Sequence, residues 1–92
     1  MNDEEKIFLT KEQAIECLII KDGQVHNFVN SGFALLGADW DIKDVEECFD
    51  EAGAIEVGGK RCRALNHGIV AVKDGNTYFF EADNEKLNKY DK

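Results

Sequence analysis

The dipeptide Asp74-Gly75 constrains the fold of this chain more than any other feature, because it lies between two segments that favour β-structure. Residues 69–73 and 76–82 are rich in Val, Tyr and Phe, which are enriched in strands. A two-residue turn between strands needs positive φ at both central positions, and Asp-Gly adopts such a turn readily. The sequence therefore predicts an antiparallel hairpin over residues 69–82.

A second antiparallel pair is predicted around the turn Asn30-Ser31-Gly32, which joins strands over residues 25–29 and 33–38. The second of these strands is apolar on both faces, a pattern typical of a strand that helices cover. We therefore expect residues 33–38 near the centre of the sheet. Residues 54–57 add a short strand, and residues 60–67 form either a further short strand or a loop.

Capping signals predict three helices. The first covers residues 11–20 and follows a Thr-x-x-Gln capping box. The second covers residues 42–52, where apolar residues recur at helical spacing and face inward. A short third helix covers residues 85–90. The residues that cap or stop these helices are Thr10 with Gln13, Gly23, Asp41, Gly53 and Asp83.

These elements together predict an α+β fold. We expect a small single domain with a largely antiparallel sheet of about four to six strands, packed by two main helices and a short C-terminal helix. The 92 residues are enough for one core, and their 43% apolar content is near the globular average. Residues 1–92 therefore form one domain, in which residues 1–8 are expected to fray.

Charge is distributed unevenly along the chain. The formal net charge of −8 disfavours direct binding to nucleic acid or to an anionic membrane, because both attract clustered positive charge. Residues 39–56 hold eight acids and one lysine, a net −7, whereas residues 57–73 hold four bases and no acid, a net +4. The molecule is therefore expected to be polarised, with one acidic and one basic segment.

The acidic segment is centred on the second helix, where Asp44, Glu47 and Glu51 share the outer face. One interpretation is a solvated helix face. The other is a mimic of DNA that binds a protein with a basic surface, such as a nucleic-acid-binding protein, and this is the function that we predict. The partner-binding residues would be Asp39, Asp41, Asp44, Glu46, Glu47, Asp50 and Glu51.

The basic segment suggests an alternative function, the binding of a small ligand of the nucleotide type. Two guanidinium groups beside a turn are able to hold a phosphate, and an aromatic ring would stack on a base. The same basic side chains would otherwise pair with the acidic helix within the molecule, and the aromatic ring would pack in the core. The ligand-binding residues of this alternative are Trp40, Arg61, Arg63, Asn66 and His67.

The three cysteines indicate neither a disulfide framework nor a metal site. Cys17, Cys48 and Cys62 are odd in number and form no CxxC pair, which fits a reducing compartment. Cys62 lies near His67, but no nucleophile motif surrounds it, so we expect no enzymatic activity. His26 is expected to be a satisfied strand histidine. The sequence thus predicts no cofactor and no metal.

No signal peptide is recognisable, and no apolar segment approaches the roughly 20 residues that span a bilayer. The sequence therefore predicts a cytoplasmic protein that binds no membrane.

Three runs of the sequence resemble small orphan proteins of phages and mobile elements in Gram-positive bacteria. They are residues 26–33 (HNFVNSGF), 36–40 (LGADW) and 62–68 (CRALNHG). Many small acidic proteins of that kind are similar to anti-defence factors, including anti-CRISPR proteins that occupy the DNA-binding groove of a nuclease, and others sequester cyclic nucleotides. The resemblance implies a partner in the bacterial host cell, such as a CRISPR-associated nuclease, and it assigns no role to any residue.

Overall fold

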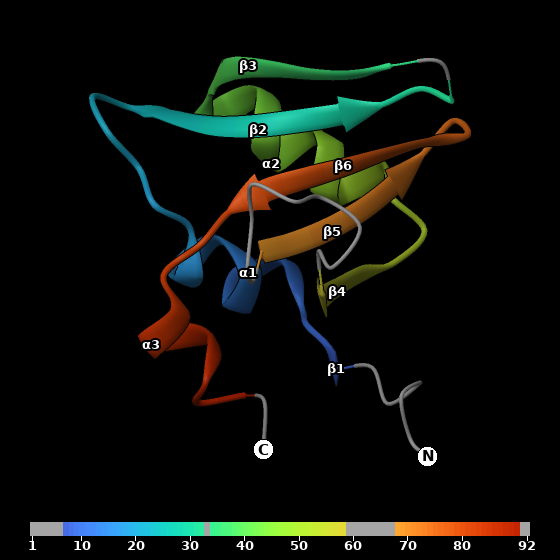
Figure 1. Ribbon diagram of the computed structural model, residues 1–92. Coiled ribbons are helices and arrows are strands. Elements are labelled where there is room, and N and C mark those ends of the chain that lie inside the picture. Colours follow the sequence, from blue (N-terminus) through green and yellow to red (C-terminus); the bar gives the residue numbers. More distant parts are fainter. Residues whose placement is uncertain (1–6, 33, 59–67, 91–92) are drawn as a thin grey trace.

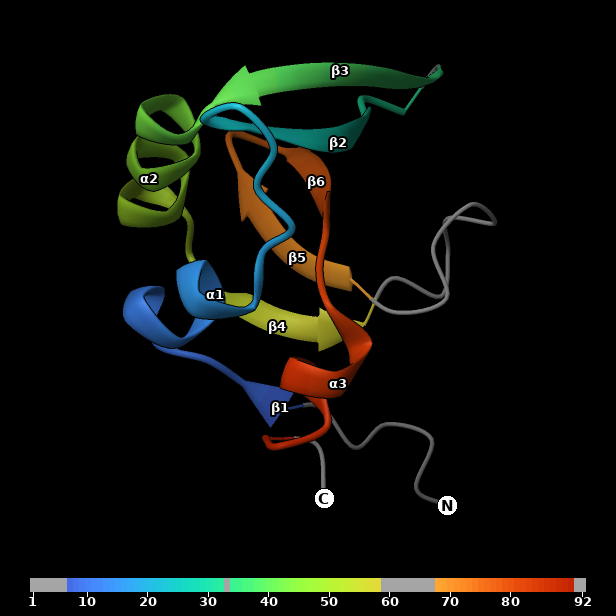
Figure 2. The ribbon, with the colours of Figure 1, turned by 90° about the vertical axis from the view of Figure 1, so that its left-hand side faces the viewer.

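The computed structural model describes residues 7–32, 34–58 and 68–90. It has an α+β fold, as the sequence predicts: six strands form one antiparallel sheet in the order β1-β4-β5-β6-β2-β3, and α1 and α2 lie on one face of it (Figures 1 and 2). The elements in chain order are β1 (Ile7–Phe8), α1 (Lys11–Cys17), β2 (Gln24–Asn30), β3 (Leu35–Asp41), α2 (Ile42–Glu51), β4 (Ile55–Gly58), β5 (Gly68–Lys73), β6 (Asn76–Glu81) and α3 (Asn84–Leu87).

The hairpin predicted from Asp74-Gly75 is confirmed. β5 and β6 pair in antiparallel register from Gly68↔Glu81 to Lys73↔Asn76. Asp74 has φ 53° and Gly75 has φ 80°, the positive values that a two-residue hairpin turn requires. This pair lies in the middle of the sheet, so the local turn signal positions its central strands.

The second hairpin is also present, but its position in the sheet differs from the prediction. Among the described strands, β3 pairs with β2 alone, so it lies at the edge of the sheet and not at its centre. Leu35 and Leu36 are 44% and 62% exposed. The prediction was wrong because a run of apolar residues is equally compatible with a buried central strand and with an edge strand whose apolar side chains face solvent.

The first helix is shorter than predicted. α1 ends at Cys17, and the next residue, Leu18, is extended and forms a bridge to Ala82. Gly23, with φ 75°, therefore does not stop the helix; it belongs to the tight turn that leads into β2. Ile19, which the prediction placed within the helix, follows it instead and is 43% exposed. Tertiary pairing with the chain near β6 overrides the helical pattern here.

The two ends of the chain also differ in detail from the prediction. Fraying was expected over residues 1–8, but Ile7 and Phe8 pair with β4. The third helix spans only Asn84–Leu87, and the Tyr90 hydroxyl beyond it donates a hydrogen bond to Glu16 Oε1 at 2.8 Å. The segment predicted as a short strand or loop over residues 60–67 lies outside the described residues.

One hydrophobic core fills the space between the helices and the sheet. Aromatic rings dominate its centre, where the Phe49 and Phe80 rings meet edge to face with centroids 5.1 Å apart. A smaller cluster of Val70, Phe79 and the half-buried Phe28 occupies the opposite face of the sheet. The largest fully buried side chains of the main core are Phe80, Ile69, Leu87, Val25, Val45, Cys17 and Cys48.

Two of the three predicted helix caps are made by the expected side chains. Thr10 and Gln13 form the capping box of α1, and the Asp83 carboxylate accepts a hydrogen bond from the Glu85 backbone N–H. Asp41 occupies the N-cap position of α2 but makes no capping bond. Its carboxylate accepts a hydrogen bond from Gln24 on β2 instead.

Within the described part of the chain, no helix has both the length and the apolar character that crossing a membrane requires.

Candidate functional site

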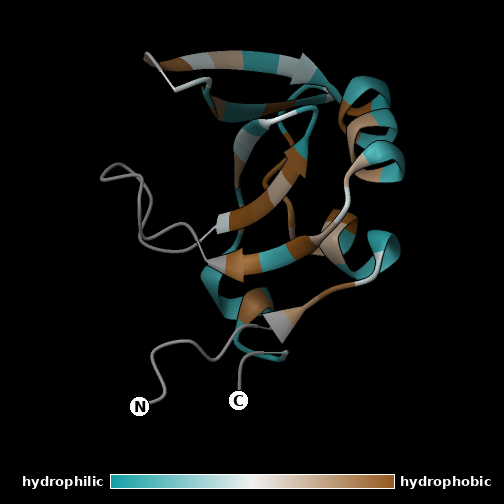
Figure 3. Ribbon diagram, turned by 90° about the vertical axis from the view of Figure 1, so that its right-hand side faces the viewer, coloured by the Kyte–Doolittle hydropathy of each residue, from teal (hydrophilic) through white to brown (hydrophobic). Residues whose placement is uncertain are grey.

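The outer face of α2 is the surface that the sequence singles out, and the core fixes its orientation. Val45, Cys48 and Phe49 are buried against the sheet, as predicted. The helical period therefore turns Asp44 and Glu47 to solvent. Figure 3 shows this separation, because hydrophilic residues dominate the outer side of α2.

Two carboxylates at the C-terminal end of α2 are paired within the molecule. Lys11 Nζ of α1 lies 2.8 Å from Asp50 Oδ1, and Lys73 Nζ of β5 lies 3.0 Å from Glu51 Oε1. The hydrogen bond to each carboxylate raises the pKa of its lysine above the usual value. Both lysines therefore stay charged at neutral pH, and they offset acidic charge at the helix end where the dipole disfavours it.

Asp44 and Glu47 remain unpaired, since neither has an ion-pair partner among residues 7–32, 34–58 and 68–90. Glu46, which is partly exposed, faces the side of the helix nearer Lys11. The free acidic charge of α2 is thus located before its last turn, over residues 44–47. It forms the centre of what we call the acidic surface, defined by Asp39, Asp41, Asp44, Glu46 and Glu47.

The end of β3 adds two carboxylates to the acidic surface. Asp39 lies directly across from His26 of β2, and its Oδ1 is 2.7 Å from His26 Nδ1. Asp41 Oδ1 accepts a hydrogen bond of 3.2 Å from Gln24 Nε2. Both aspartates are exposed, so these contacts orient the carboxylates without removing them from solvent.

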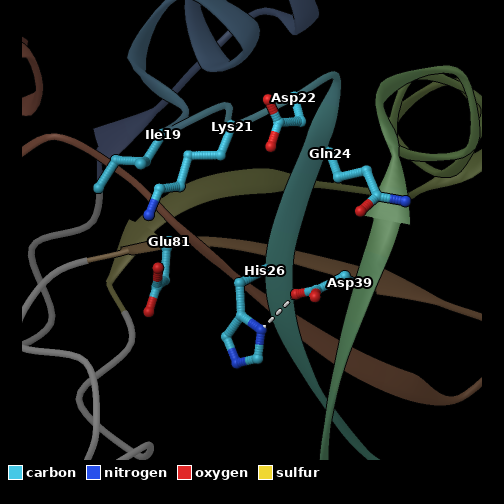
Figure 4. A pocket seen from close by; sticks show the side chains of 7 residues that line it. All are labelled: Ile19, Lys21, Asp22, Gln24, His26, Asp39 and Glu81. Atoms are coloured by element: carbon cyan, nitrogen blue, oxygen red, sulfur yellow. Dashed lines mark hydrogen bonds and ion pairs between the residues drawn. The ribbon is translucent and has the colours of Figure 1, made fainter.

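The His26–Asp39 pair also borders a small pocket, which the sequence did not predict. The pocket has a volume of about 360 Å³ and lies where the chain after α1 passes β2, β3 and β6 (Figure 4). The residues that line it are Ile19, Lys21, Asp22, Gln24, His26, Asp39 and Glu81.

The charges of this pocket do not suit a phosphate. Asp22, Asp39 and Glu81 supply three carboxylates against the single ammonium of Lys21, so the pocket is net negative when His26 is neutral. An anion would be repelled at this position. Among the described residues, no group of three or more His, Cys, Asp or Glu side chains is arranged to hold a metal ion.

Trp40, the aromatic residue of the alternative ligand site, packs between the sheet and the helices. Its ring lies 5.3 Å from Tyr78 and 5.9 Å from Phe80 between centroids, and it is partly buried. This is the packing role that the sequence left open for it. The other four residues of that site (Arg61, Arg63, Asn66 and His67) lie outside the described residues, as does Cys62.

The two described cysteines are buried thiols. Burial raises the pKa of Cys17 and raises that of Cys48 to about 11. Thiols with such pKa values are protonated at neutral pH and are poor nucleophiles. Neither cysteine therefore belongs to the acidic surface or offers reactive chemistry.

No protein-family model matches the sequence, and neither the curated proteins nor the solved structures include a significant match to it.

Proposed function

We propose that this protein is a non-enzymatic interaction protein that binds a basic, nucleic-acid-binding protein through its acidic surface. The observation that carries the proposal is the exposure of Asp44 and Glu47 on α2 without an ion-pair partner among the described residues. Like charges three or four residues apart destabilise a helix by a few tenths of a kcal/mol per pair. A partner with complementary charge relieves this repulsion and accelerates association.

The charge spacing on α2 supports a partner that normally binds nucleic acid. The five carboxylates of α2 lie within residues 44–51, which span about 10 Å of the helix axis, so successive carboxylates are about 1.5–4.5 Å apart along the axis. One strand of DNA carries one phosphate per about 3.4 Å. The pairing of Asp50 and Glu51 with lysines limits this similarity in charge spacing to Asp44, Glu46 and Glu47. The helix dipole also favours negative charge in the first turn, at Asp44. The sequence resembles small phage and mobile-element proteins, many of which are similar to anti-defence factors, and we therefore include a host nuclease in the proposed class of partner.

Two double variants, each with two carboxylates replaced by lysine, test the proposal. Asp44→Lys with Glu47→Lys changes the acidic surface, and Glu12→Lys with Glu85→Lys changes the net charge equally at exposed positions on α1 and α3. Each variant and the wild type serve as bait in a bacterial lysate treated with nuclease, at low and at high salt. Circular dichroism of each bait confirms that the fold is retained.

We expect the wild type to capture a specific protein at low salt, and an excess of double-stranded DNA to displace it. The control variant should capture the same protein, and the Asp44→Lys/Glu47→Lys variant should lose at least about nine-tenths of it, because each reversed charge replaces attraction with repulsion. Equal capture by both variants, or capture that neither salt nor DNA reduces, would contradict the proposal.

A further inference from the structure

Among the described residues, no strand pairs with the outer edge of β3. β3 pairs with β2 through seven consecutive residue pairs, from Gln24↔Asp41 to Asn30↔Leu35, and no described strand pairs with its other side. In a strand, backbone N–H and C=O groups point alternately to the two sides. Alternate residues of β3 therefore present unpaired donors and acceptors at the edge of the sheet, at the top in Figures 1 and 2.

This edge lacks most of the devices that keep edge strands from pairing. β3 contains no Lys, Arg or Pro, and its one-to-one register with β2 has no bulge. It also exposes two leucines, Leu35 and Leu36. The opposite edge of the sheet differs, because β1 has only two residues within the described part of the chain. Of the two edges as the described residues form them, that of β3 is the longer and offers more backbone groups to a further strand.

We propose that the edge of β3 accepts an extended, basic segment of the protein partner as a seventh strand of the sheet. The inference rests on the proposed function, because the segment belongs to the same basic partner. In this arrangement the backbone of β3 forms the hydrogen bonds with the incoming segment, and the carboxylates of α2 attract the partner over a longer distance. Strand addition of this kind obtains affinity from backbone hydrogen bonds and specificity from alternate side chains.

Charge selects a basic segment over a second copy of the chain. Asp39 and Asp41 lie on the same face of β3, the face turned away from the main core, and α2 with its own carboxylates follows them directly in the chain. A second copy would bring two more aspartates and a net charge of −8 to this edge. Repulsion between like charges disfavours that pairing at neutral pH, whereas lysines or arginines opposite the aspartates would be attracted.

The spacing along β3 defines the pattern of the incoming strand. Residues opposite Asp39 and Asp41 are two positions apart and should both be basic. Apolar residues are expected opposite Leu35 and Leu36, at the other end of the strand. The matching segment therefore has two basic residues two positions apart and, beyond two intervening residues, two adjacent apolar residues.

Capped heptapeptides provide a probe that needs no knowledge of the natural partner. Lys-Thr-Lys-Thr-Thr-Val-Val fits an antiparallel strand, and the reversed sequence fits a parallel one. In the matched controls two adjacent prolines replace the central Thr-Thr, which removes donors from both sides of the peptide but keeps its charge. Binding is followed by NMR titration and by amide hydrogen exchange of β3.

A second comparison uses variants of the protein. Leu36→Lys adds to the edge the type of charge that natural edge strands use for protection. Ile20→Lys makes the same change of charge at another exposed apolar residue, outside the sheet. Both side chains are exposed in the structure, so both variants should fold.

We expect one threonine peptide to bind about tenfold or more tightly than its proline control, the equivalent of about two net hydrogen bonds. Exchange should slow at alternate β3 amides, and Leu36→Lys should weaken binding while Ile20→Lys does not. Equal binding of threonine and proline peptides, or no binding, would overturn strand addition. The proposed function would not be affected, because the lysate experiment tests it separately. Protection of the β3 edge by self-association at neutral pH would also overturn it.

Discussion

Asn27 is a polar residue at the centre of the sheet whose surroundings are apolar. It is fully buried on β2, and neither its Nδ2 nor its Oδ1 has a hydrogen-bond partner among the described residues. It pairs with Phe80 on one side and Ala38 on the other. Burial of an unsatisfied amide costs about 1–3 kcal/mol, so Asn27 should be a weak point in an otherwise apolar core.

Two substitutions of nearly equal volume test this interpretation. Asn27→Val removes both unsatisfied atoms and introduces a β-branched residue that favours strands, so it should raise the free energy of unfolding by about 1–3 kcal/mol. Asn27→Thr gives a side chain of nearly the same shape as valine but with a hydroxyl group. The threonine variant should therefore be less stable than the valine variant. Urea unfolding measures both. A threonine variant as stable as the valine variant would show that the site satisfies a polar group, for example with a buried water molecule.

At the scale of single elements, local signals predicted the helices and hairpins and failed where tertiary pairing decides. The capping box at Thr10 and the turn at Asp74-Gly75 depend on neighbouring residues only, and both are present. The end of α1 was misplaced because Leu18 pairs with Ala82, which is distant in sequence. A strand that pairs with a distant segment has no local signal that separates it from the last turn of a helix.

The register of the second hairpin explains why part of the candidate site was missed. A three-residue turn over residues 30–32 would pair residue 29 with residue 33, whereas the structure pairs Val29 with Leu36. A shift by an odd number of residues exchanges the faces of the strand. The observed register places Asp39 opposite His26, and the pocket follows from that contact. The exposure of Asp44 and Glu47 on α2, in contrast, follows from the helical period alone.

The helix caps supply a prediction at this scale that separates stability from binding. Thr10→Ala removes the hydroxyl that accepts the Gln13 N–H, and it should lower the free energy of unfolding by about 1 kcal/mol. Asp41→Ala should cost less, because Asp41 makes no capping bond and its hydrogen bond to Gln24 is exposed. Urea unfolding of the two variants measures the difference. A larger loss for Asp41→Ala would mean that its charge, and not a hydrogen bond, stabilises the start of α2.

For the whole molecule, the net charge of −8 and the open edge of β3 have to be considered together. An exposed edge strand with two leucines is a site of self-association. Net charge of one sign keeps protein molecules apart in solution. We therefore infer that the acidity of the chain has two consequences: it attracts a basic partner, and it keeps the edge free until that partner arrives.

Protection of the β3 edge by charge repulsion should be lost as the pH approaches the pI of about 4.6, where the net charge of the protein approaches zero. We expect a monomer at pH 7 and concentration-dependent association near pH 4.6, both measured by sedimentation velocity. Leu36→Lys should reduce the association more than Ile20→Lys, although the two variants have the same net charge, because only the first blocks the β3 edge. Equal association of the two variants would place the contact on another surface, and the acidity would then not protect β3.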